Sequence, residues 1–231
     1  MEILGVRVDN LSEEEILGRI ESFLEDNIQR YIVTPNSEFL VRAQRDKKFM
    51  KILNKSDLAA PDSMGLVFAS WYLGESLKKR FAGVDLMERI CQRAVQKQWQ
   101  ILLIGGRKRI ARKTKEVLEK KYPGLLVKRI NMVEFDKYST ERRVILFVAL
   151  GAPKQEKWIA RNLRKNPSIN LAIGVGGAFD FISGRVKRAP KFLRLVGMEW
   201  AWRLMVQPWR VKRVFNAIIV FPWLVVKNSW K

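Results

Sequence analysis

Two glycine-rich turns, each directly after an apolar run, are the part of this 231-residue sequence that most clearly indicates chemistry. The first turn begins at Gly151, after the apolar run at 144–150. The second turn contains three glycines, Gly174, Gly176 and Gly177. Apolar runs closed by glycine are typical of strands buried in a parallel sheet, and ligands of such sheets bind beyond the carboxyl ends of the strands. The two turns therefore predict a site for a phosphate-bearing ligand.

Polar residues also end two earlier predicted strands. Thr34 and Asn36 follow a strand expected near 30–34, and Asp62 follows one expected near 57–60. At the carboxyl edge of the sheet, Asp62 is a candidate general base for a substrate hydroxyl, a role that contributes about 10²–10⁴-fold in rate. An ordinary helix N-cap is the alternative for Asp62, and turn formation is the alternative for Thr34 and Asn36.

A glycine pair, Gly105 and Gly106, follows the strand expected at 100–105 and precedes a basic helix, which could bring backbone N–H groups to a diphosphate. The GxGxxG spacing of dinucleotide sites is missing, and the next strand ends at Lys128-Arg129 instead of an acid. An NADP-dependent oxidoreductase, in which Lys128-Arg129 would bind a ribose phosphate, stays open as an alternative.

Other polar side chains could contact a nucleotide or a sugar. Gln155 could offer its amide to a base or a sugar, and Asp180 could accept a hydrogen bond from a uracil N–H. Arginine is suited to bidentate binding of phosphate oxygens. The four candidate cations are Arg80, Arg203, Arg210 and Arg213. Each of these residues has an ordinary alternative, as part of a helix start, a cap or a charged surface.

Composition excludes several classes of mechanism. The sequence has no histidine and a single cysteine, so imidazole catalysis, a disulfide and a cysteine metal cage are not available. Cys91 lies in a helical apolar pattern, where we expect a small core residue. The nearest acidic pair, Glu134 and Asp136, is expected in a loop and not at a strand end. We therefore expect neither a metal ion nor another cofactor.

Predicted strands near 2–8, 30–34, 57–60, 100–105, 125–129, 144–150 and 170–175 alternate with amphipathic segments. This alternation predicts an α/β fold, a Rossmann-like, mostly parallel sheet flanked by helices. We expect a catalytic domain over 1–190, in which Ser12 and Glu15 begin the first helix with a capping box. No signal peptide is recognised at residues 1–8, so a cytoplasmic location is expected.

Residues 191–231 differ from the rest and predict a helical appendage. The formal net charge is +21, and residues 185–231 hold 11 Lys and Arg against one acid. The longest uncharged run there, 214–226, has 13 residues and contains a proline, whereas a spanning helix needs about 20. Tryptophan mixed with basic residues suits a helix lying on an anionic membrane. The alternatives are a helical lid packed on the core and, from the charge, a nucleic-acid-binding protein.

Taken together, these segments resemble the WecG/TagA/CpsF family of bacterial glycosyltransferases. The resemblance covers nearly the whole chain, and its longest block, at 174–192, is highly specific. The matching segments are TPN at 34–36, PD at 61–62, RFAGVDL at 80–86, LLIGG at 102–106, GAPKQEKW at 151–158, GVGGAFDFISGRVKRAPKF at 174–192 and GMEWAWRL at 197–204.

The resemblance implies inverting transfer of N-acetylmannosamine from a UDP-sugar to N-acetylglucosamine on undecaprenyl diphosphate, in teichoic acid or related surface-glycan synthesis. Another UDP-sugar donor, such as the uronic acid form, stays open. Asp62 would be the base, Arg203, Arg210 and Arg213 would close over the diphosphate, and the remaining candidates would line the substrate site. The implied partners are the UDP-sugar, the polyprenyl-linked acceptor and the cytoplasmic face of the membrane. A homo-oligomer is possible, and nucleic acid is not an expected partner.

Overall fold

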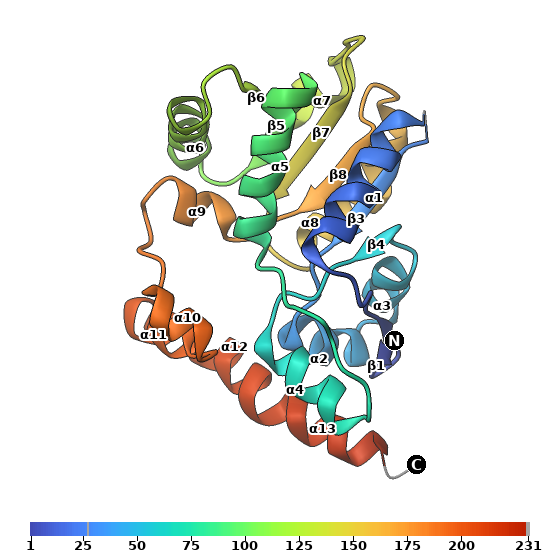
Figure 1. Cartoon of the computed structure of the whole chain (residues 1–231), viewed down its shortest axis with the longest axis vertical. Helices are drawn as coiled ribbons and strands as arrows, with labels where there is room; N and C mark the ends of the chain where they lie inside the picture. Colours follow the sequence, from blue (N-terminus) through green and yellow to red (C-terminus); the bar gives the residue numbers. More distant parts are fainter. Residues whose placement is uncertain (27, 230–231) are drawn as a thin grey trace.

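The computed structural model describes residues 1–26 and 28–229 and confirms the predicted α/β fold. Six parallel strands form the central sheet in the order β4-β3-β8-β7-β5-β6 (Figure 1). In chain order they are β3 (Arg30–Val33), β4 (Leu58–Ala59), β5 (Gln100–Gly105), β6 (Leu126–Arg129), β7 (Val144–Ala149) and β8 (Leu171–Gly174).

The strand predicted near residues 2–8 is wrong. The chain instead forms a separate hairpin of two short strands, β1 (Glu2–Ile3) and β2 (Val6–Arg7). Leu4 and Gly5 adopt positive φ angles of 52° and 75°, which turn the chain back on itself. Such angles are typical of tight hairpin turns, and the hairpin lies outside the parallel sheet.

Helices cover both faces of the sheet because side chains alternate along each strand. Ile101 and Leu103 of β5 face the cluster formed with α1, α5, α6 and α9, whereas Leu102 and Ile104 face the cluster formed with α7 and α8. The helices of these first 190 residues are α1 (Glu13–Glu25), α2 (Ser37–Arg45), α3 (Lys47–Asn54), α4 (Met64–Tyr72), α5 (Gly83–Lys97), α6 (Lys108–Lys121), α7 (Met132–Lys137), α8 (Lys154–Asn162), η1 (Leu163–Lys165) and α9 (Ala178–Ile182).

Several local predictions can be compared directly with the structure. The capping box at the start of α1 is confirmed, since Ser12 N–H donates to Glu15 and Glu15 N–H donates to Ser12 Oγ at 3.3 Å. Cys91 is fully buried, as predicted. The loop predicted around Glu134 and Asp136 is wrong, because Asn131 and Glu134 form a second capping box that begins the short helix α7.

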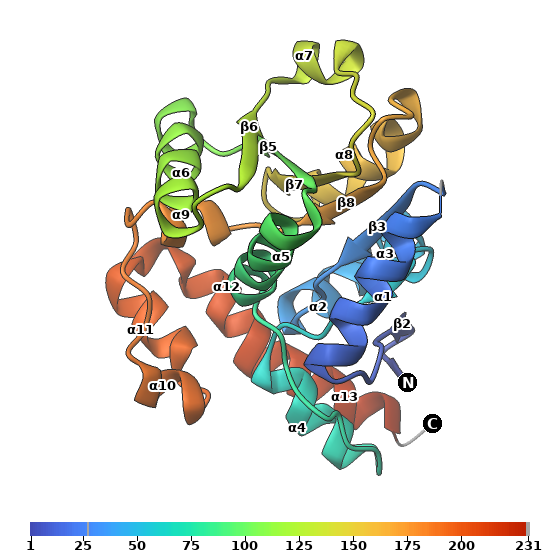
Figure 2. The ribbon, with the colours of Figure 1, turned by 45° about the horizontal axis from the view of Figure 1, so that its top comes forward.

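The described part of the appendage, residues 191–229, is called the C-terminal segment below; Trp230 and Lys231 lie outside the described residues. Phe221 and Val225 are buried in one cluster with α2, α3 and α4, so the segment packs on the core (Figure 2). Among residues 1–26 and 28–229, every helix is too short or too polar to span a bilayer. The helices of the C-terminal segment are α10 (Lys191–Leu195), α11 (Glu199–Val206), η2 (Pro208–Arg210), α12 (Val211–Phe215), the π-helix η3 (Asn216–Val220) and α13 (Phe221–Ser229).

Gly105, predicted to bind a diphosphate, has a structural reason to be glycine. Its φ is +91°, and a Cβ there would lie 2.7 Å from the backbone oxygen of Ala149 on the adjacent strand.

We expect Gly105→Ala to lower the free energy of unfolding by about 2–4 kcal/mol. Gly18→Ala is the matched control, because α1 leaves that position open, and it should raise stability by about 0.5–1 kcal/mol. Urea unfolding of both variants tests this, and equal stability of the two would contradict it.

Candidate active site

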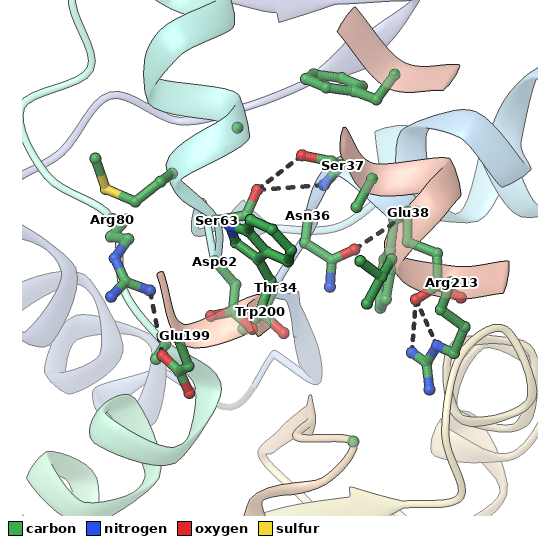
Figure 3. A pocket seen from close by; sticks show the side chains of 18 of the residues that line it. Thr34, Asn36, Ser37, Glu38, Asp62, Ser63, Arg80, Glu199, Trp200 and Arg213 are labelled. Atoms are coloured by element: carbon green, nitrogen blue, oxygen red, sulfur yellow. Dashed lines mark hydrogen bonds and ion pairs between the residues drawn. The ribbon is translucent and has the colours of Figure 1, made fainter. Parts of the chain in front are cut away.

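A cavity of about 650 Å³ lies at the carboxyl edge of the sheet, beneath the C-terminal segment. Most of the polar candidates line it, and Figure 3 shows several of them pointing into one space. The predicted residues that line the cavity are Thr34, Asn36, Asp62, Arg80, Gly151, Gln155, Gly176, Gly177, Arg203, Arg210 and Arg213.

Asp62 lines this cavity. Its backbone N–H donates to the Pro35 carbonyl at 2.8 Å, which ties the loops after β3 and β4 together. The N-cap alternative for Asp62 is wrong, because Ser63 occupies the cap position of α4. A Cβ at Gly83 would lie 3.9 Å from Asp62 Oδ2 and 3.7 Å from Thr34 Oγ1. The carboxylate and the hydroxyl therefore converge beside Gly83.

Thr34 and Asn36 are positioned by local hydrogen bonds. The Thr34 hydroxyl donates to the Gly174 carbonyl at 3.3 Å, although 140 residues separate the two. Asn36 is the N-cap of α2 and accepts from Phe39 N–H at 3.1 Å, so its side-chain oxygen begins this helix. The Ser63 hydroxyl accepts from Ser37 N–H at 3.2 Å. These contacts fix the loops on either side of Asp62.

Electrostatics make Asp62 a weaker acid than an exposed aspartate. Burial raises its pKa to about 7, and Glu199 acts in the same direction. Arg203 and Arg80 favour the carboxylate and oppose the shift, as does a hydrogen bond from the Gly83 backbone. A base with a pKa near the working pH is well matched to proton transfer.

Among the arginines, Arg203 of α11 lowers the pKa of Asp62 the most. Its guanidinium stacks on the Phe181 ring, 4.5 Å from the centroid, and its Nε is buried without a hydrogen-bond partner. A Cβ at Gly177 would lie 3.6 Å from its Nη2, so the arginine reaches the second glycine turn. Burial lowers the pKa of Arg203 below its usual range. Arg203 lines the cavity, where its guanidinium is suited to binding an anion.

The other three arginines already have partners. Arg80 donates to the Arg194 carbonyl at 2.9 Å and lies 3.6 Å from Glu199. Arg213 contacts Glu38 of α2 through two nitrogens, at 2.7 and 2.6 Å. Arg210 donates from Nε to the side-chain oxygen of Gln207, and burial, together with Arg203, lowers its pKa to about 10.

Gln155 holds the two glycine turns together. Its Oε1 accepts from Gly151 N–H at 3.2 Å and from Gly176 N–H at 3.0 Å, and its Nε2 donates to Glu156 at 2.6 Å. The sequence predicted that this amide contacts a base or a sugar. The amide is buried and its oxygen accepts two hydrogen bonds, so it positions the turns, and its contact with a base or a sugar stays a prediction.

Four predicted residues are not among those that line the cavity. Gly106 adopts a φ of +65° at the end of β5, next to Gly105. A Cβ at Gly174 would lie 2.7 Å from Gln155 Nε2, so this glycine makes room for the amide. Asp180 forms an ion pair with Arg185 at 3.1 Å. Contact of these residues with a nucleotide stays a prediction.

The sequence reasoning missed Glu38, Glu199, Trp200 and Glu156. The first three line the cavity, and Glu156 is buried behind it with its pKa raised by burial to about 7. Glu199 could have been found, because it is the single acid among 11 basic residues in 185–231. Glu38 follows the TPN segment in a helix, where an acid near the N-terminus has an ordinary reason to occur.

Comparison with known proteins identifies the relatives of this chain. The sequence pattern described as "Glycosyl transferase WecG/TagA/CpsF family" matches residues 1–231. Three similar proteins carry the name N-acetylglucosaminyldiphosphoundecaprenol N-acetyl-beta-D-mannosaminyltransferase. The one from Bacillus spizizenii is 33% identical over 203 residues, covering 84% of this chain and 78% of the relative. The Bacillus subtilis protein is 31% identical with the same coverage, and the Staphylococcus aureus protein is 26% identical over 100% of this chain and 94% of its own.

The family match covers the segments that supply the cavity, from the loops after β3 and β4 to the arginines of the C-terminal segment. The chain therefore belongs to the glycosyl transferase WecG/TagA/CpsF family.

Proposed function

We propose that this protein transfers N-acetylmannosamine from UDP-N-acetylmannosamine to N-acetylglucosamine on undecaprenyl diphosphate. The names of its relatives support this acceptor and this sugar. The observation that carries the proposal is one cavity holding a carboxylate with a raised pKa and arginines positioned to meet a diphosphate. The family match favours this function over the nucleic-acid-binding and oxidoreductase alternatives.

The proposed mechanism is a single inverting displacement. Asp62 removes the proton from the acceptor hydroxyl as that oxygen bonds to the anomeric carbon of the donor. The bond from the anomeric carbon to the diphosphate breaks, and UDP leaves with the electron pair. Arg203, Arg210 and Arg213 stabilise the negative charge that grows on UDP. A well-placed donor of this kind contributes about 3–4 kcal/mol to lowering the barrier.

The exposed side of the C-terminal segment supports a membrane partner. Phe192, Trp209 and Trp223 are 70%, 74% and 57% exposed. Tryptophan prefers the headgroup layer, and neighbouring lysine and arginine attract anionic lipid. We propose peripheral binding at the cytoplasmic face, where a lipid-linked acceptor can be reached. Oligomerisation and a place in teichoic acid or related glycan synthesis belong to the same proposal.

Donor and reaction can be tested together. We expect acceptor-dependent release of UDP from UDP-N-acetylmannosamine, measured with the lipid product by mass spectrometry against a panel of UDP-sugars. Asp62→Asn should lower kcat by about 10²–10⁴-fold, with its fold checked by circular dichroism. Preference for another donor, such as the uronic acid form, would contradict the proposed sugar, and full activity of Asp62→Asn would contradict the proposed base.

The raised pKa of Asp62 predicts the pH dependence. A base acts as the carboxylate, so kcat/KM should rise with pH through about 7 and level off above it. The pKa of Glu156 is also raised, to about 7, but this residue does not line the cavity. Glu156→Gln is therefore the control and should leave the pH of half-maximal kcat/KM unchanged. A half-maximal value near 4 would contradict the assignment of this limb to Asp62.

Leaving-group stabilisation by arginine predicts transfer without a metal ion. We expect turnover to continue in EDTA, and we expect Arg203→Met to lower kcat by about 10²-fold or more, because one charge-stabilising donor is lost. Steady-state kinetics with and without EDTA, magnesium or manganese measures both effects. Loss of turnover in EDTA that magnesium or manganese restores would show that the arginines do not suffice.

A further inference from the structure

The cavity has a second part, lined by α4, η3 and α13, that the proposed mechanism does not use. No Asp, Glu, Lys or Arg is among the described residues that these three elements give to the cavity. Their lining residues repeat every three or four positions, which places them on one side of each helix. The repeat comprises Phe68, Ala69 and Tyr72 on α4, and Pro222, Val225 and Val226 on α13.

The two helices lie side by side in the same direction, as Figures 1 and 2 both show. At one end, a Cβ at Gly65 would lie 3.7 Å from the Phe221 ring. At the other end, the Ser229 hydroxyl donates to the Tyr72 hydroxyl at 3.3 Å. Seven residues of α4 separate these contacts, a length of about 10 Å. Both helices line the cavity along this length, from Met64, two residues after Asp62, to Tyr72 and Val226, and this shared lining is called the α4–α13 groove below.

The groove has a buried floor and an exposed rim. Phe221 and Val225 are only 1% and 4% exposed, whereas Phe68, Tyr72 and Val226 are 54%, 52% and 42% exposed. Water contact with large apolar side chains is unfavourable, and gathered exposed apolar side chains mark binding sites for apolar partners. The groove therefore suits a slender apolar chain that reaches the catalytic end of the same cavity.

We propose that this α4–α13 groove binds the first isoprenyl units of the lipid-linked acceptor. The inference rests on the proposed function, which requires one molecule to place a sugar hydroxyl at Asp62 while its prenyl chain leaves the cavity. α4 begins at Met64, two residues after Asp62, so the groove starts where the sugar must lie. Apolar lining, the absence of charge among those lining residues, and continuity with the catalytic cavity all match a prenyl chain.

The test compares two esters of N-acetylglucosamine diphosphate, one farnesyl and one methyl, with the full chain in lipid-free buffer. Calorimetry measures Kd, and UDP release measures kcat/KM. We expect the wild type to favour the farnesyl ester by at least about tenfold, and Phe68→Ser to remove about tenfold of this preference while the methyl ester is unaffected. Val226→Ser is a second groove variant and should act in the same direction.

Trp223→Ser is the matched control, because Trp223 lies on the same helix as Val226, is 57% exposed and does not line the cavity. It should leave the preference unchanged. Equal affinity of the wild type for both esters, or an equal effect of Trp223→Ser and Phe68→Ser, would overturn the groove. Tight binding of the farnesyl ester without transfer from any UDP-sugar would overturn the proposed function and leave the groove standing.

Discussion

Partial burial of the Asp62 carboxylate in the cavity is the constraint on which the rest of the site depends. A buried carboxylate is costly unless cations or hydrogen-bond donors face it. The Gly83 backbone supplies one donor, and Arg80 and Arg203 supply the charge, against the opposing effect of Glu199. Since Arg203 comes from the C-terminal segment, that segment must fold over the carboxyl edge for the site to be electrostatically complete.

The C-terminal segment contributes both basic and apolar side chains to the cavity. Its Arg203 reaches the second glycine turn, and its last helix supplies apolar side chains next to α4. Phe221 and Val225 anchor the segment in a core cluster, and Arg213 binds Glu38 of α2. Packing and charge thus hold a basic surface and an apolar surface together in one cavity.

Much of the site could be predicted from the sequence because a parallel sheet brings the carboxyl ends of its strands to one edge. This rule was enough to place Thr34, Asp62 and the turn at Gly151 around one cavity. It could not show that the side-chain oxygen of Gln155 accepts hydrogen bonds from two backbone N–H groups, because these contacts depend on the distance between the two turns. It also could not show that the closeness of Ala149 already requires a glycine at Gly105.

Errors in the fold had similarly local causes. The apolar pattern at residues 2–8 predicts a strand, but two positive φ angles divide it into a hairpin. Residues 132–137 carry too little pattern for a helix, and the capping box at Asn131 decides the outcome. The sequence does not separate a packed lid from a membrane surface in the C-terminal segment, since its apolar residues form both a buried contact and an exposed face.

The most direct measurement is an NMR titration of the Asp62 carboxyl carbon in the wild type and in Arg203→Met. The structure predicts a pKa of about 7 in the wild type and a higher value in the variant, because Arg203 favours the carboxylate. A wild-type pKa near 4 that does not respond to Arg203→Met would contradict a buried base whose protonation depends on the C-terminal segment.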